Sequence, residues 1–182
     1  MALSKNTASR AKAFDVSSLL TTGAVAGLVV GFPFIVANMI YATSQSALPV
    51  PNAPKLPAIA PFLDIGTIFY FDDMPQLMNP SYPLAGLITH FSLSMVFGVI
   101  FALVLVPLLK NATTLLIGAV AYGGLLYIVN YQILGRVVFE WFDPSSPMGP
   151  NPWFGLITHL GFGLLLVPFF LTASSRSARG PA

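Results

Sequence analysis

The stretch LAGLITHFSLSMVFGVIFALVLVPLL, from Leu84 to Leu109, decides the fold because it contains no charged residue. A bilayer core takes about 20 consecutive apolar residues as helix, so this stretch predicts a membrane-spanning helix. Three further stretches are long and apolar enough to cross, at about residues 16–42, 113–138 and 153–172. The sequence therefore predicts one all-α membrane domain over residues 1–182, built as a four-helix transmembrane bundle.

The composition supports this class and excludes others. Hydrophobic residues make up 55% of the chain and charged residues 8%, and the mean hydropathy is +0.80. Such values do not occur in ordinary soluble domains. A net charge of +2 without a basic patch argues against nucleic-acid binding. The absence of cysteine excludes disulfides and thiolate metal sites. No phosphate-binding loop, His-Glu-x-x-His string or nucleophile elbow is present, so the sequence gives no sign of an enzyme.

The basic residues predict the orientation, because short loops rich in lysine and arginine stay in the cytoplasm. Most of them precede the first span, occupy the turn between the second and third, or follow the fourth: Lys5, Arg10, Lys12, Lys110, Arg176 and Arg179. The longer loops 43–83 and 139–152 then lie outside. We expect a multi-pass protein of the bacterial inner membrane with both termini in the cytoplasm.

The chain has two histidines, and both end the same five-residue string. Gly86-Leu-Ile-Thr-His90 opens the second span, and Gly155-Leu-Ile-Thr-His159 opens the fourth. A weaker echo links Gly23-Ala-Val-Ala26 in the first span to Gly118-Ala-Val-Ala121 in the third. These strings indicate an internal repeat, a two-helix unit used twice. Two such copies have the same orientation, related by a pseudo-twofold axis along the membrane normal.

The two histidines are predicted to share a polar layer with two asparagines. At about 1.5 Å of rise per residue, His90 and His159 lie at nearly the same depth below the outer surface. Asn38 and Asn130, on spans that run the opposite way, approach that depth too. Polar groups in hydrocarbon are costly unless they are paired or face a cavity. We therefore expect all four side chains to point into the bundle.

Small residues at helical spacing predict close helix packing. They recur along the first span and beside both histidines, at Gly23, Gly27, Gly31, Gly86, Ser94, Gly98, Gly155 and Gly163. The turn at Lys110-Asn111-Ala112 is so short that the second and third spans are expected to be antiparallel neighbours. In the first outer loop, residues 59–71 become apolar again and predict a short helix or flap at the membrane interface.

Three interpretations of the polar layer remain open. The side chains tie helices together by hydrogen bonds, each worth on the order of 1 kcal/mol in membrane proteins. Alternatively, His90 and His159 are the axial ligands of a b-type haem. In the third, the histidines form a proton-relay or ion site, or bind a pigment or metal. The identity of any metal is unknown, since two histidines without a nearby carboxylate supply fewer ligands than metal sites usually have.

Part of the chain resembles the YagU-like family of small bacterial inner-membrane proteins. The resemblance covers about half the chain and rests on Thr89-His90-x-x-x-Ser94-x-Val96-Phe97, the basic turn at Lys110, Gly118-Ala119 and Gly155-x-x-x-His159-Leu160. The last helix differs from the family pattern, with Thr158 directly before the histidine and Leu160-Gly161-Phe162 after it. The resemblance implies a four-helix membrane fold, a suggested link to acid tolerance, and no reaction.

Together these patterns predict a non-catalytic integral membrane subunit or scaffold of a larger inner-membrane complex. The abundance of small-residue faces motivates the larger assembly, and the expected partners are lipid and other membrane-protein subunits. An electron-transfer subunit that binds haem through His90 and His159 is the alternative. Proton or ion translocation by an oligomer is the second alternative.

Overall fold

The computed structural model describes residues 15–45, 54–71, 79–140, 143 and 151–178, the last seven without their side chains. The described part is helical, and its helices are α1 (Val16–Ser44), α2 (Ala60–Tyr70), α3 (Ser81–Ile100), α4 (Ala112–Tyr127), α5 (Gly135–Val137) and α6 (Pro152–Ala178). A π-helical turn, Phe101–Leu105, and a 3-10 turn, Val106–Leu108, extend α3; a π-helical segment, Ile128–Leu134, joins α4 to α5.

Four helical stretches are long and apolar enough to cross a membrane: Val16–Ser44, Ser81–Leu108, Ala112–Val137 and Pro152–Leu171. Each lies within a few residues of its predicted bounds, which confirms the four-helix prediction.

Side-chain caps fix the residues at which two of these helices begin. The Asp15 side chain accepts a hydrogen bond from the Ser17 backbone at α1. Asn111 and Thr114 form a reciprocal capping box at α4.

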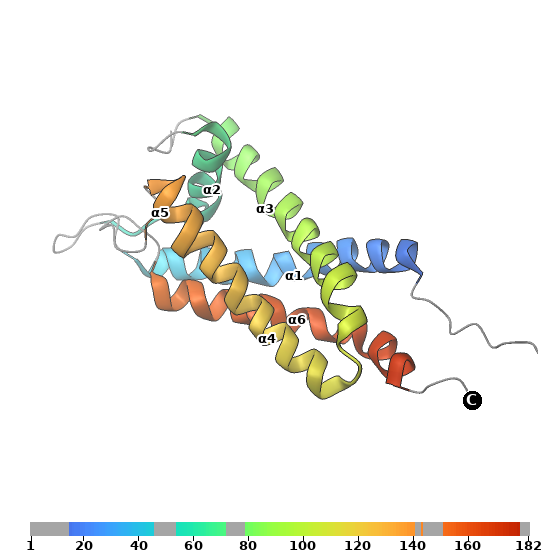
Figure 1. The fold of residues 1–182 in the computed structure, drawn as a ribbon. Coiled ribbons are helices and arrows are strands. Elements are labelled where there is room, and N and C mark those ends of the chain that lie inside the picture. The colour runs from blue at the N-terminus through green and yellow to red at the C-terminus, as the bar shows by residue number, and fades with distance from the viewer. Residues whose placement is uncertain (1–14, 46–53, 72–78, 141–142, 144–150, 179–182) are drawn as a thin grey trace, which may run out of the picture.

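The helices pack as two pairs, α1 on α3 and α4 on α6, and the pairs meet mainly where α1 contacts α6 (Figure 1). This pairing agrees with a two-helix unit used twice. The start of α1, the turn between α3 and α4, and the C-terminus of α6 lie at one end of the bundle. The helices α2 and α5 lie at the other, which we call the α2 end.

Glycine makes the α1–α3 contact close. A Cβ atom built at Gly23 would lie 2.8 Å from the backbone oxygen of Gly98, and one built at Gly27 would overlap the backbone of Ser94. Contacts this close leave no room for side chains, so the two backbones touch directly. The predicted small-residue face on α1 is therefore used inside the chain, by α3.

Glycines also bring the backbones of α4 and α6 into close contact. A Cβ at Gly163 would overlap the Ala119 carbonyl, and one at Gly123 would overlap the carbonyl of His159. Gly155 differs, because a Cβ there would meet only the rings of Tyr127 and Tyr131 at ordinary van der Waals distance. Gly155 therefore packs against two tyrosine rings and not against a neighbouring backbone.

The short turn does not make α3 and α4 packing partners, and that prediction is wrong. The two helices run antiparallel but diverge from residues 109–111 (Figure 1). Their small-residue faces explain this, since α3 turns its face to α1 and α4 turns its face to α6. Backbone contact over several turns outweighs the proximity that one connection imposes.

The predicted short helix in the first outer loop is present as α2, which packs mainly on α3. Glycine again allows the contact: a Cβ at Gly86 would overlap the Phe62 carbonyl, and one at Gly66 would overlap that of Tyr82. Gly86 thus packs against α2. Arg136 Nε, on α5, lies 3.8 Å from Asp143 Oδ1 in the second outer loop. The aromatics Trp141 and Phe142 lie outside the described residues.

Candidate functional site

His90, on α3, is buried and reaches across to α1. Only 6% of the residue is exposed, and its Nε2 lies 2.9 Å from the backbone oxygen of Gly31. A carbonyl oxygen only accepts, so Nε2 carries the hydrogen and donates it. In the neutral ring Nδ1 is then an acceptor, and no described group lies within hydrogen-bond distance of it.

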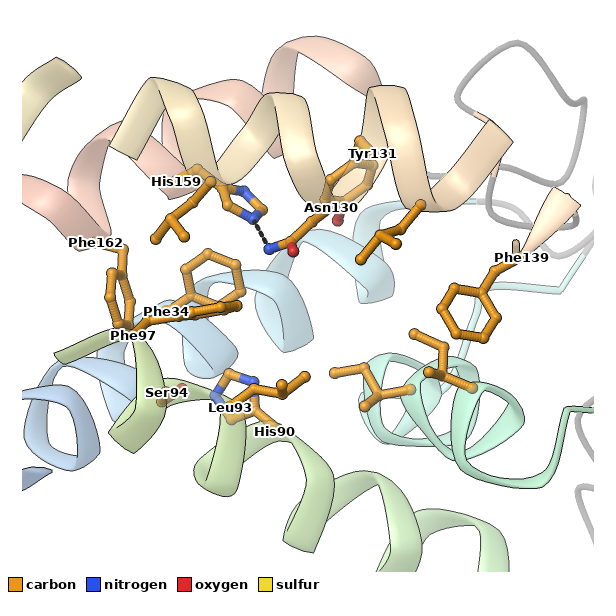
Figure 2. Close-up of a pocket in the computed structure, with 14 residues that line it drawn as sticks. Phe34, His90, Leu93, Ser94, Phe97, Asn130, Tyr131, Phe139, His159 and Phe162 are labelled. Atoms are coloured by element: carbon orange, nitrogen blue, oxygen red, sulfur yellow. Dashed lines mark hydrogen bonds between the residues drawn. The ribbon is translucent and has the colours of Figure 1, made fainter. Parts of the chain in front are cut away.

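His159, on α6, is held in the opposite tautomer. Its Nδ1 lies 2.7 Å from the carbonyl oxygen of Gly155, one turn earlier, and donates to it. Its Nε2 therefore accepts a hydrogen bond from the Asn130 side-chain nitrogen, 3.2 Å away (Figure 2). The Gly155 carbonyl thus fixes the orientation of the imidazole ring, and the ring in turn holds the Asn130 side chain in place. Only 4% of His159 is exposed.

Phe34, on α1, joins the two histidines. Its ring centre lies 5.7 Å from that of His90, nearly parallel, and 5.1 Å from that of His159, at right angles. Among the described residues the two imidazoles make no ring contact with each other. The histidines that end the two copies of the five-residue string thus both contact one phenyl ring.

A cavity of about 150 Å³ lies beside these groups at the α2 end, between α3 on one side and α4 on the other (Figure 2). On the α4 side, α4 itself supplies Leu126, and the π-helical segment after it supplies Asn130, Tyr131 and Leu134. The helices α1, α2 and α6, together with Phe139, contribute the rest of the wall. Its lining residues are Phe34, Ile65, Ile68, His90, Leu93, Ser94, Phe97, Leu126, Asn130, Tyr131, Leu134, Phe139, His159 and Phe162. None is a lysine, arginine, aspartate or glutamate.

Asn38 does not join the polar layer. Its side-chain nitrogen donates to the Phe34 carbonyl of its own helix at 2.8 Å, and it does not line the cavity. The prediction that Asn38 belongs to the polar layer, which rested on depth alone, is therefore wrong. A polar side chain that satisfies itself on its own helix needs no partner across the bundle, and depth alone does not reveal that choice.

Three groups on the cavity wall keep unused hydrogen-bonding capacity besides His90. The Ser94 hydroxyl, on a residue that is 4% exposed, and the Tyr131 hydroxyl have no hydrogen-bond partner in the described part of the chain. Asn130 uses one N–H on His159, which leaves its side-chain oxygen and second N–H unpaired. No side-chain nitrogen or oxygen among the described residues is both fully buried and unpaired, so these atoms keep accessible surface on which a ligand can form hydrogen bonds.

The arrangement does not suit a haem or a metal centre. Both Nε2 atoms are engaged, one by Gly31 and the other by Asn130, and Phe34 contacts both rings. Drug-sized ligands occupy pockets of about 300–1,000 Å³, well above this volume. Among the described residues no group of three or more metal-ligating side chains occurs. In this geometry neither histidine presents a free Nε2 atom to a haem iron.

Asp64, on α2, is the acidic group closest to the site, near enough to Tyr131 for an electrostatic interaction. Part of its surface is exposed, but surrounding protein displaces water from the carboxyl and raises its pKa to about 6. In an unfolded chain an aspartate has a pKa of about 3.9. The folded state therefore binds this proton more tightly than the unfolded state does.

A pH dependence of stability follows. The contribution of protonated Asp64 is fully present below about pH 4 and is lost as the pH rises through about 6. We expect the thermal unfolding midpoint in detergent to fall modestly over that window, since partial exposure weakens the effect. The substitution Asp64→Asn should remove the dependence. A wild-type midpoint that rises from pH 4 to pH 7 while the variant stays level would contradict this account.

The sequence reasoning found both histidines and Asn130 but missed Phe34, Tyr131 and Gly123. Phe34 and Tyr131 are two of many aromatics in apolar spans, and no spacing rule distinguishes them. A signal for Gly123 was available, because it lies on α4 four residues after Ala119 and so repeats the small-residue spacing of α1.

Comparison with protein-family models, with characterised proteins and with solved structures found no match to this chain. The resemblance to the YagU-like family therefore stays a prediction. The chain is a multi-pass membrane protein with a mainly apolar cavity between α3 and α4 that both histidines line.

Proposed function

We propose that this chain is a non-catalytic membrane protein that binds a small lipophilic molecule carrying one ring. The observation that carries the proposal is the cavity between α3 and α4, which have diverged instead of packing together. A cavity of about 150 Å³ lined by apolar side chains is large enough to hold one benzene-sized ring. Because both flanking helices are long enough to cross the membrane, the ligand reaches the site sideways from the bilayer.

Saturable binding of tritiated prenylbenzene to the purified protein in lipid nanodiscs tests this function. Leu134 lines the cavity, whereas its neighbour Ile133 is 49% exposed on the outside of the bundle. The variant Leu134→Trp fills the cavity and should abolish saturable binding. The matched control Ile133→Trp should leave it unchanged. Binding that is absent in the wild type, or equal in both variants, contradicts the proposal.

The role of subunit or scaffold in a larger complex stays a prediction. Its motive was the number of small-residue faces, and α3 and α6 cover those of α1 and α4 within the chain. Extraction in mild detergent distinguishes the two roles. A subunit elutes with companion proteins, whereas a self-contained binding protein elutes alone. Ion translocation has no support from the cavity wall, which carries no carboxylate or ammonium group among the described residues.

The proposed location is the bacterial inner membrane, with both termini in the cytoplasm. Because the chain lacks cysteine, single cysteines report the topology directly. We expect a membrane-impermeant maleimide to label Glu140→Cys in intact cells and to label Lys110→Cys only after permeabilisation. Both positions are exposed, so the difference reflects the side of the membrane. The reverse labelling pattern would invert the proposed orientation.

A further inference from the structure

We infer that the ring bound in this cavity is the head group of a prenylated 1,4-quinone or hydroquinone. The inference rests on the proposed function, because it names the ligand class of the same site. Its basis is the placement of unpaired polar groups on two facing walls. His90 and Ser94 line the cavity from α3, and the Ser94 side chain also packs against Gly31 of α1. Asn130 and Tyr131 line the cavity from the π-helical segment after α4 (Figure 2). A ring that satisfies both walls needs oxygen atoms at opposite positions.

The hydrogen-bonding types match both redox forms of such a ring. Quinone oxygens only accept, and the Ser94 hydroxyl on one wall and the free N–H of Asn130 on the other can donate to them. Hydroquinone hydroxyls also donate, and the unprotonated Nδ1 of His90 and the free oxygen of Asn130 can accept from them. Each wall therefore holds a donor and an acceptor.

The unpaired polar atoms are accessible, which makes them available to a ligand. His90 and Ser94 are 6% and 4% exposed as residues, and neither Nδ1 nor the hydroxyl has a partner in the described part of the chain. No side-chain nitrogen or oxygen among the described residues is both fully buried and without a partner, so these two atoms keep accessible surface. A hydrocarbon ring would leave all of these groups unpaired. A ring with opposed oxygens offers a hydrogen-bond partner to both walls at once.

The cavity also selects against charged lipids. Its wall carries no lysine, arginine, aspartate or glutamate, so a phosphate or carboxylate head group would be buried without a countercharge. The volume is sufficient for one six-membered ring. Phe34, Phe97 and Phe162 line the same space and offer aromatic faces and edges to that ring. The apolar tail remains in the bilayer.

Equilibrium binding of tritiated prenyl-1,4-benzoquinone and tritiated prenylbenzene to the wild type in nanodiscs tests the inference. The two probes share tail and ring, so their affinity ratio isolates the oxygens. We expect the quinone to bind about tenfold more tightly, the value of one well-formed hydrogen bond. In Asn130→Leu that ratio should fall severalfold, because one wall loses its donor and its acceptor. Asn38→Leu is the matched control, because Asn38 bonds its own helix outside the cavity, and should keep the tenfold ratio.

Because Asn130→Leu also removes the partner of His159, two milder variants accompany it. Tyr131→Phe and Ser94→Ala each delete a hydroxyl that has no described partner, so both should fold normally and each should lower the ratio severalfold. Equal binding of both probes to the wild type overturns the inference and leaves the proposed function standing. A ratio that survives all three variants also overturns it. If neither probe binds saturably, the inference and the proposed function fall together.

Discussion

The substitution Gly27→Ala is expected to separate α1 from α3 and to destabilise the whole bundle. A Cβ at this position would overlap the Ser94 carbonyl, and backbone, unlike the end of a long side chain, cannot move aside alone. Overpacking typically costs about 1–3 kcal/mol, and a clash with backbone belongs at the upper end. For a chain of this size that corresponds to a fall of roughly 6–12 °C in the midpoint of thermal unfolding.

Gly161→Ala is the matched control. Gly161 lies in a transmembrane helix, as Gly27 does, but a Cβ there meets nothing within 4 Å. Replacing it should leave the midpoint unchanged or raise it slightly, since alanine favours helix by up to about 1 kcal/mol over glycine. Fluorescence-detected gel filtration after heating in detergent measures both variants. Equal midpoints for the two would contradict the direct backbone contact between α1 and α3.

The substitution Phe34→Ala is expected to have the second largest effect, because its ring holds both histidines. Phe34 contacts His90, His159 and Phe162 and packs against the core. In a membrane the unfolded reference is also apolar, so the cost comes chiefly from the space left behind. At about 24 cal/mol per Å³, the loss of roughly 100 Å³ costs about 2 kcal/mol. The variant should also lose saturable binding of a ring, because the cavity loses part of its wall.

Phe32→Ala tests whether this effect depends on position. Phe32 lies two residues away, is 56% exposed and contacts Phe91. Its replacement removes the same atoms from the lipid-facing side, where lipid refills the space. We expect a loss of less than about 1 kcal/mol and unchanged ring binding. Similar losses of stability and binding in both variants would show that Phe34 has no special place in the site.

The sequence predicted the spans well and the arrangement of the helices less well. Charge-free stretches such as 84–109 set the length and number of crossing helices almost by themselves. Helix contacts depend instead on which faces meet. The glycines of α1 predicted a close helix contact but not which helix makes it. The short turn at Lys110 predicted that α3 and α4 pack together, which they do not. Three-dimensional pairing was needed to show that α3 takes the face of α1.

For the candidate site, the sequence likewise predicted the key residues better than their contacts. The repeated string drew attention to His90 and His159, and their burial agrees with the cost of placing polar groups against lipid. The tautomers could not be predicted, because they depend on carbonyls that come near only in the fold, such as Gly31 for His90. The same holds for Asn38 and Asn130. Both were predicted from depth to join the polar layer, yet one bonds its own helix and the other bonds a histidine.

Photolabelling tests the central claim, a ring-binding cavity between α3 and α4, most directly. A prenylbenzene that carries a diazirine on its ring is irradiated with the protein in nanodiscs, with and without excess unlabelled prenylbenzene. The account predicts adducts on the cavity-lining Leu126 and Leu134 that the competitor removes. Adducts confined to exposed positions such as Ile133, and insensitive to the competitor, would contradict it.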